Sequence, residues 1–115
     1  SGLDGMIKMI NEKTVTRIRE FVKNRNWEQF HTNENLVKSI VIESAELLEL
    51  YQWSSESSRT EDIKDEIADV LTYIIMLCDK NGYNMDEIIN NKLDRNIKKY
   101  PVDKAYGSSK KYNQL

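Results

Sequence analysis

The sequence predicts an all-α domain, and three observations carry that prediction. Apolar residues recur at spacings of three and four along most of the chain, which is the period of a helix with one buried face. No segment alternates apolar and polar residues as a half-buried strand would. Only 4 glycines and 1 proline interrupt the 115 residues, so turns are few.

Four segments with helical spacing are bounded by capping or turn residues and are expected to form helices: 14–23, 35–53, 60–81 and 85–99. Thr14 is the expected N-cap of the first helix, and an aromatic loop follows it. "NGY" at 81–83 ends the third helix, since glycine favours the position after a helix. The fourth ends before Pro101, because the residue before a proline avoids helical geometry.

The chain has room for one compact domain, expected over residues 12–115. Residues 1–11 are expected to be disordered or a cloning remnant, and the basic tail from about 101 to be flexible. No membrane-length apolar run or signal-like start occurs, so a cytoplasmic protein without membrane attachment is expected. With Cys78 and His31 the only residues of their kinds, any bound metal must be held by oxygen.

Two predicted helices carry carboxylates close to their apolar faces. On the second helix the expected core face is an arc that includes Leu36, Val41 and Leu48, and Glu43 lies well away from the polar side. Burying a lone carboxylate costs several kcal/mol unless a partner or cation neutralises it. On the third helix Glu66 and its neighbours flank the apolar side, so antiparallel packing of the two helices would bring the carboxylates together.

This geometry predicts a Mg²⁺ or Mn²⁺ site, because these cations prefer oxygen ligands and would offset the repulsion between like charges. The carboxylates in question are Glu43, Glu46, Glu66 and Asp69. The alternative is that they are solvated helix residues paired with lysines. A di-iron bundle would need Glu-x-x-His repeats, and His31 lies outside any such motif.

The acidic motifs "ESAE" at 43–46 and "EIAD" at 66–69 occur together with "WEQFH" at 27–31, "ELYQW" at 49–53, "NIKKYP" at 96–101 and "SSKKY" at 108–112. In this order they resemble the MazG-like all-α nucleoside triphosphate pyrophosphohydrolases, most of all the dCTP pyrophosphatase branch. The resemblance implies a four-helix MazG-like bundle completed by dimerisation, in a homodimer or homotetramer. It also implies Mg²⁺-dependent cleavage of a nucleoside triphosphate between the α- and β-phosphates, a house-cleaning reaction on dCTP or a modified deoxynucleotide.

The resemblance also implies roles for individual residues. The four carboxylates would bind the metal, and Glu46 or Glu49 would accept a proton from the attacking water. Base-pocket and phosphate- or sugar-binding positions would be Trp27, His31, Trp53, Tyr73, Lys92, Asn96, Lys99 and Lys110. Taken without the resemblance, the aromatic residues and histidine could equally pack in the core, and the lysines could be solvated.

The alternative function is a non-catalytic helical module that forms oligomers and regulates a partner. Intact acidic motifs favour the enzyme over this module. A nucleic-acid polymer is not an expected partner, because the chain carries a net charge of −2 and its aromatic residues lie beside carboxylates.

Overall fold

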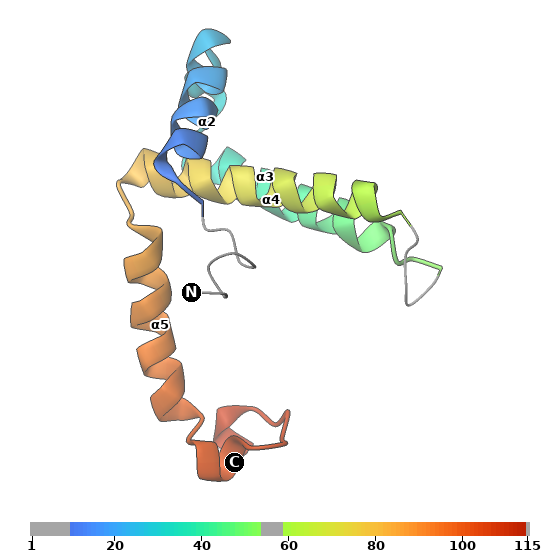
Figure 1. The fold of residues 1–115 in the computed structure, drawn as a ribbon, viewed down its shortest axis with the longest axis vertical. Helices are drawn as coiled ribbons and strands as arrows, with labels where there is room; N and C mark the ends of the chain where they lie inside the picture. Colours follow the sequence, from blue (N-terminus) through green and yellow to red (C-terminus); the bar gives the residue numbers. More distant parts are fainter. Residues whose placement is uncertain (1–9, 54–58, 115) are drawn as a thin grey trace. The chain divides into compact units, whose positions relative to one another are not determined.

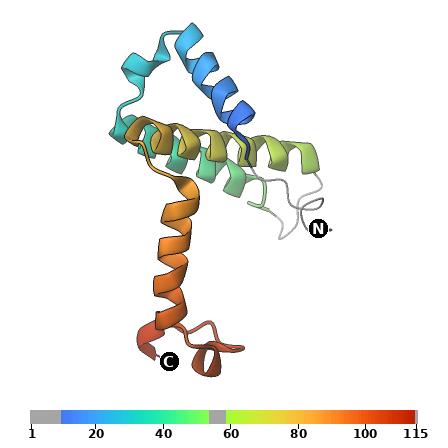
Figure 2. The same ribbon diagram turned by 60° about the vertical axis from the view of Figure 1, so that its left-hand side comes forward.

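The computed structural model describes residues 10–53 and 59–114, and these residues are helical with no strand among them, which confirms the all-α prediction. The chain forms two compact units, residues 1–81 and 82–115, which are described separately. The first contains α2 (Glu12–Asn24), the 3₁₀ helix η1 (Trp27–Phe30), α3 (Asn33–Glu49) and α4 (Thr60–Asn81) (Figures 1 and 2). The serine-rich link at 54–58 and residues 1–9 lie outside the described residues. Within the described part, no helix has the length and apolar character needed to cross a membrane.

Helix α2 begins two residues earlier than predicted because a different residue caps it. The side chain of Asn11 accepts a hydrogen bond from the Thr14 amide at 3.1 Å, so Thr14 lies inside the first turn and its predicted capping role is wrong. After α2, Asn26 adopts a left-handed conformation with φ 54°, and the chain enters η1. The aromatic segment predicted as a loop is therefore partly a 3₁₀ helix, whose Trp27 packs edge-on against Phe21 with ring centroids 5.5 Å apart.

Helix α3 is capped by Thr32, whose hydroxyl oxygen accepts from the Asn35 amide at 3.1 Å. It ends at Glu49, four residues before the predicted end at Trp53. The next three amides, of residues 50–52, donate to carbonyl oxygens three residues back, which tightens the chain into 3₁₀-type turns. Helix α4 has the predicted bounds, and Gly82 follows it with φ 68°, a conformation that favours glycine.

Helices α3 and α4 run antiparallel side by side, as predicted (Figures 1 and 2). One row of α3 is buried or half-buried: Leu36, Ile40, Glu43, Leu47 and Leu50. The matching row of α4 contains Ile63, Glu66, Val70, Leu77 and Asn81. We call these two rows the α3–α4 seam. It places one carboxylate of each helix at a position where an apolar residue would normally pack.

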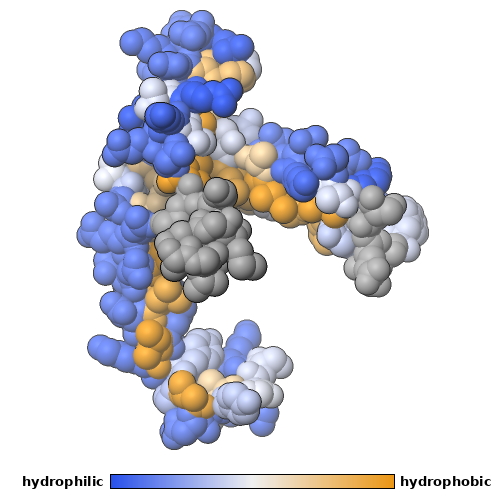
Figure 3. Space-filling model, viewed as in Figure 1, coloured by the Kyte–Doolittle hydropathy of each residue, from blue (hydrophilic) through white to orange (hydrophobic). Residues whose placement is uncertain are grey.

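The seam corrects the core face predicted for α3. Leu36 is 1% exposed, but Val37, Val41 and Leu48 are 48%, 63% and 71% exposed. The arc of greatest apolarity on the helical wheel and the row that faces α4 are therefore different. The seam passes through Glu43, and the more apolar flank remains uncovered in this unit. Figure 3 shows apolar residues gathered along the α3–α4 pair.

Two side-chain contacts between helices fix the ends of this unit. Asn33 and Asn81 exchange hydrogen bonds between their side-chain amides at 3.2 and 2.9 Å, and Asn81 also donates to the Leu77 carbonyl oxygen. Arg19 on α2 donates two hydrogen bonds of 3.0 Å from Nε to the carboxylate of Asp79 on α4. This guanidinium lowers the pKa of Asp79. The first contact sets the register of α3 against α4, and the second holds α2 on α4.

The second unit consists of α5 (Met85–Lys99), α6 (Val102–Ala105) and the 3₁₀ helix η2 (Tyr112–Gln114). Helix α5 has the predicted bounds and is capped by Asn84, which accepts from the Glu87 amide at 3.0 Å. Neither α6 nor η2 is predicted from the sequence. Tyr112 packs edge-on against Tyr100 at 6.3 Å between centroids, so two short elements of the tail have local structure. The flexibility of the tail stays a prediction.

Candidate active site

Three of the four predicted metal ligands come together where α3 meets α4. One carboxylate oxygen each of Glu43, Glu46 and Glu66 lies within 4.8 Å of the other two. Glu43 and Glu66 are half-buried members of the seam, and Glu46 lies one turn from Glu43 on the exposed side. The antiparallel pairing that the sequence predicts is therefore what gathers these carboxylates. We call the three residues the acidic cluster.

In the described part of the chain, no positively charged side chain pairs with the acidic cluster. The Oε2 atoms of Glu43 and Glu66 are buried and have no hydrogen-bond partner. Burial raises the pKa of Glu43 to about 7, and the neighbouring Glu46 carboxylate adds to the shift. Burial also raises the pKa of Glu66, again with a contribution from Glu46. Each carboxyl group holds its proton more tightly because burial disfavours the charged form and the neighbouring negative charges add to that effect.

The alternative of solvated carboxylates paired with lysines does not describe this cluster. Among residues 10–53 and 59–114, the carboxylates in ion pairs are those of Glu34, Glu61, Asp62 and Asp79. None of them belongs to the cluster. Unpaired buried carboxylate oxygens are costly unless a cation or proton binds them.

The donor set fits a small divalent cation. Octahedral Mg²⁺ binds oxygen at about 2.0–2.1 Å, which separates neighbouring ligands by about 3 Å and opposite ligands by about 4 Å. The three oxygens of the acidic cluster lie within 4.8 Å of one another, which is close to the spacing that this cation needs. All three donors are carboxylates, which Mg²⁺ and Mn²⁺ prefer. Two of the three carboxylates, those of Glu43 and Glu66, each carry a buried oxygen that lacks a partner.

Asp69, the fourth predicted ligand, lies near the cluster but outside its compact set of oxygens. Its charge contributes to the raised pKa values of Glu43 and Glu66. Asp69 also lines a cavity of about 460 Å³ between α2 and α4. It therefore marks the junction between the acidic cluster and this cavity.

The cavity is bordered by three groups of residues, and we call it the aromatic cavity. Its lining residues are Thr14, Arg17, Ile18 and Phe21 from α2, Trp27 and His31 from and after η1, and Asp69, Thr72, Tyr73 and Met76 from α4. Three predicted substrate-binding residues, Trp27, His31 and Tyr73, are thus brought to one cavity. Each helix contributes residues at spacings of three and four, because one face of each helix borders the cavity.

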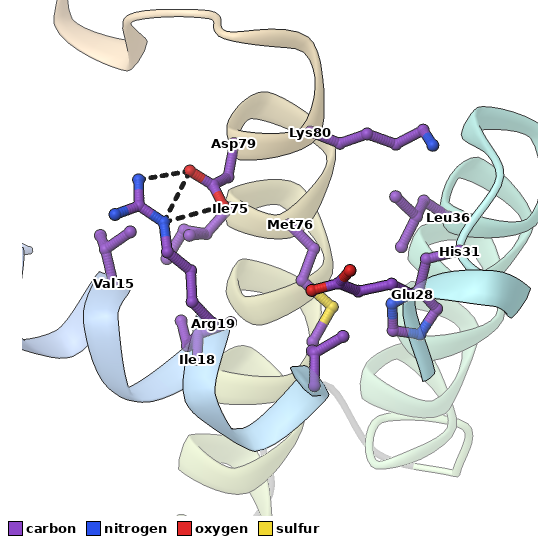
Figure 4. Close-up of a pocket in the computed structure, with 11 residues that line it drawn as sticks. Val15, Ile18, Arg19, Glu28, His31, Leu36, Ile75, Met76, Asp79 and Lys80 are labelled. Atoms are coloured by element: carbon purple, nitrogen blue, oxygen red, sulfur yellow. Dashed lines mark hydrogen bonds and ion pairs between the residues drawn. The ribbon is translucent and has the colours of Figure 1, made fainter. Parts of the chain in front are cut away.

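A second cavity of about 270 Å³ shares part of its lining with the aromatic cavity, and Figure 4 shows the residues around it. Ile18, His31 and Met76 line both cavities. The Arg19–Asp79 ion pair lies at one side of the second cavity, and Glu28 and His31 lie at the other. His31 therefore borders both cavities.

Other predicted site residues are not part of this arrangement. Trp53 lies beyond the end of α3 and is 91% exposed, and Glu49 is the exposed last residue of α3, outside the acidic cluster. Four more belong to the second unit: Lys92, Asn96, Lys99 and Lys110. There Lys99 Nζ lies 5.0 Å from the centroid of Tyr112, and Asn96 is half-buried. The role of these residues in the site stays a prediction.

Sequence reasoning missed several residues of the aromatic cavity. Thr14, Arg17 and Thr72 were not candidates, because polar residues on a helix are normally solvated. Phe21 lies within the predicted helix 14–23 and is not among the predicted site residues. A signal was available, since Thr14, Arg17, Ile18 and Phe21 share one helical face, and so do Asp69, Thr72, Tyr73 and Met76.

Comparison with known proteins agrees with the fold and the acidic cluster. The MazG-like family matches residues 38–115, which include both acidic motifs. dCTP pyrophosphatase 1 of Mus musculus is 34% identical over 117 residues, 90% of this chain and 69% of that protein. The human protein of the same name is 32% identical over 124 residues, 96% and 73% of the two chains. The crystal structure of a pyrophosphatase from Archaeoglobus fulgidus has a TM-score of 0.74 and 39% identity, covering 83% of this chain and 98% of that one.

An all-helical fold with an oxygen-only acidic cluster, related over most of its length to pyrophosphatases, defines an enzyme of the hydrolase class. The resemblance found in the sequence is confirmed. The chain belongs to the MazG-like family.

Proposed function

We propose that this nucleotide pyrophosphatase depends on Mg²⁺ and cleaves the α–β phosphoanhydride bond of a nucleoside triphosphate. The products are a nucleoside monophosphate and pyrophosphate. The observation that carries the proposal is the pair of buried, unpartnered carboxylate oxygens of Glu43 and Glu66, beside a third carboxylate and next to the aromatic cavity. dCTP or a modified deoxynucleotide is the proposed substrate, because the curated relatives carry the name dCTP pyrophosphatase.

Each part of the site has a distinct task in this proposal. Bound Mg²⁺, or Mn²⁺ in its place, would neutralise charge on the phosphates and orient water for in-line attack. Glu43 and Glu66 hold their carboxylates rigidly because both lie in the seam, and Asp69 completes the ligand set. The exposed Glu46, or Glu49 one turn further along α3, accepts the proton of the attacking water. No protein nucleophile is required.

The aromatic cavity is the proposed place of the nucleobase. Trp27 and Tyr73 offer flat rings for stacking, and His31 offers a ring nitrogen to the base edge. Lys92, Asn96, Lys99 and Lys110 are proposed to contact phosphates and sugar, and Trp53 to cover the base. A free cytoplasmic nucleotide, rather than a polymer, is the proposed substrate, because the net charge of −2 does not favour binding of a phosphate polymer.

The test of the reaction is to identify its products. The full chain is incubated with Mg²⁺ and separately with dCTP, dGTP, dTTP, dATP or CTP, and the products are separated by anion-exchange chromatography. We expect one monophosphate and one pyrophosphate for each triphosphate consumed. Release of a diphosphate and inorganic phosphate would overturn the proposed bond of attack, and absence of products from every nucleotide would overturn the proposed activity.

We further propose that the protein assembles as a homodimer or homotetramer. The uncovered flank of α3 and α4 supports this: its exposed apolar residues are Val37, Val41, Leu48, Ile67 and Leu71. An apolar patch of this extent along one helix pair is typical of an interface between subunits (Figure 3).

Leu48→Glu is expected to dissociate the oligomer, because a charge would then be placed in an apolar interface. Light scattering during size-exclusion chromatography should show a mass near that of one 13.5 kDa chain for the variant and a multiple of it for the unaltered protein. Lys38→Glu, which changes an exposed residue on the same helix, is the matched control and should leave the mass unchanged. A single-chain mass for the unaltered protein would contradict the proposal.

A further inference from the structure

Arg17 is the cation on the lining of the aromatic cavity, and it differs from the other arginines of its segment. Arg19 is paired with Asp79, to which its Nε donates two hydrogen bonds. Arg25 donates to the Phe21 carbonyl oxygen at 3.1 Å and lies 3.9 Å over the Phe21 ring. Within residues 10–53 and 59–114, Arg17 makes no hydrogen bond and no ion pair. Its donors are free for a ligand.

The surroundings of Arg17 favour a nucleobase over a phosphate as that ligand. Three aromatic rings line the same cavity, those of Phe21, Trp27 and Tyr73. Asp69 lines this cavity and its charge acts on Glu43 and Glu66, so the acidic cluster, where a metal-bound triphosphate would lie, is close to the Asp69 side of the cavity. A nucleotide with its phosphates at the cluster would therefore extend its base into the aromatic cavity, toward the α2 face that carries Arg17.

A guanidinium group imposes a geometric condition on the base it recognises. It carries only donors, arranged as a rigid planar fork that pairs best with two adjacent acceptors. Cytosine offers such a pair at O2 and N3, and guanine offers one at O6 and N7. Thymine and uracil place an N3–H donor between their carbonyl groups, and adenine places an amino group beside N1 and N7.

We propose that Arg17 is a specificity-determining residue that binds two adjacent acceptors on the nucleobase and selects cytosine or guanine nucleotides over thymine and adenine nucleotides. This inference rests on the proposed function, because it takes the aromatic cavity as the place of the base. Stacking on the aromatic rings holds any base, so the discrimination comes from the donor fork.

The test compares Arg17→Met and Arg17→Lys with the unaltered protein. Catalytic efficiency, kcat/KM, is measured by pyrophosphate release for dCTP, dGTP, dTTP and dATP. Arg17→Met is expected to lower the ratio of dCTP to dTTP efficiency by about 10- to 100-fold, the scale of one bidentate contact to a base. Arg17→Lys keeps the charge but lacks the planar pair of donors, so it should lower the ratio of dCTP to dTTP efficiency nearly as much as Arg17→Met does. Lys23→Met, an exposed change on the same helix, should leave all ratios unchanged.

A binding measurement separates this inference from the proposed reaction. Quenching of tryptophan fluorescence by deoxycytidine, deoxyguanosine, thymidine and deoxyadenosine requires neither metal nor hydrolysis. Preference for the first two that is lost in Arg17→Met would support the inference even in a protein that hydrolyses no triphosphate, which would overturn only the proposed function. An equal loss of efficiency for all four triphosphates would show that Arg17 contacts phosphate, and unchanged ratios would show no contact. Either result overturns the inference.

Discussion

Glu43→Gln is expected to lower kcat/KM for nucleotide hydrolysis by about 100-fold or more while the helical fold persists. Glu43 supplies one of the three clustered oxygens and, because it lies in the seam, no other side chain can replace it. Loss of even an outer partner of a metal ligand reduces metal affinity or activity by about 10- to 100-fold, so loss of a direct ligand should reach or exceed the upper end of that range. Pyrophosphate release measures the activity, and far-ultraviolet circular dichroism measures the fold.

The same substitution should change the pH dependence of stability. Burial raises the pKa of Glu43 to about 7 from the ordinary value of 4.5, so between these pH values the folded protein holds the proton more tightly than the unfolded chain does. The contribution of Glu43 to stability is therefore largest below pH 4.5 and is lost as pH rises through about 7. In the presence of a chelator, the thermal midpoint of the unaltered protein should fall relative to that of Glu43→Gln across this window.

Glu34→Gln is the control for both measurements, because Glu34 is an exposed carboxylate on the same helix, paired with Lys38. It should retain activity and the pH dependence of the unaltered protein. Full activity in Glu43→Gln would remove Glu43 from the metal site. A constant difference between the two thermal midpoints from pH 4.5 to 7 would show that its carboxylate is not buried in the folded protein.

Removal of divalent cations is expected to abolish hydrolysis of every triphosphate, and addition of Mg²⁺ or Mn²⁺ in excess over EDTA should restore it. The acidic cluster consists of carboxylates, so the negative charge on the phosphates cannot be offset there without a cation. Cation binding should also raise the thermal midpoint of the protein without nucleotide, because it relieves the repulsion among Glu43, Glu46 and Glu66.

The thermal measurement distinguishes a metal bound by the protein from a metal bound only by the nucleotide. Mg²⁺ should raise the midpoint of the unaltered protein and of Glu34→Gln, but much less that of Glu66→Gln. Hydrolysis that continues in EDTA would disprove the metal requirement. A midpoint shift of equal size in Glu66→Gln would place the bound cation elsewhere.

The sequence predicts the helices well where their end signals are local. Thr60 and the glycine at 82 correctly mark the two ends of α4, and Pro101 explains the end of α5. The predicted end of α3 is wrong because the change from four-residue to three-residue hydrogen bonds after Glu49 does not alter the spacing of the apolar residues. The predicted cap of α2 is wrong because Asn11 and Thr14 are both good capping residues, and only the structure shows which side chain accepts the hydrogen bond from a backbone amide.

The site is predicted in part, for a related reason. The acidic cluster follows from spacing, because residues three apart on one helix share a face whatever the tertiary structure. The correct buried row of α3 does not follow, because Val41 and Leu48 are more apolar than the seam residue Glu43. Spacing places Arg17 on one face of α2 with Ile18 and Phe21, but only the packing of α2 on α4 shows that this face borders the aromatic cavity.

The reciprocal bond between Asn33 and Asn81 has a consequence for how the sequences of such proteins can change in length. One residue inserted between Asn33 and Glu43 would turn the downstream part of α3 by about 100° relative to the asparagine pair, carrying Glu43 away from Glu66. One residue inserted in the connection between α3 and α4 turns neither helix. Insertions and deletions should therefore be tolerated in that connection and selected against in the first ten residues of α3.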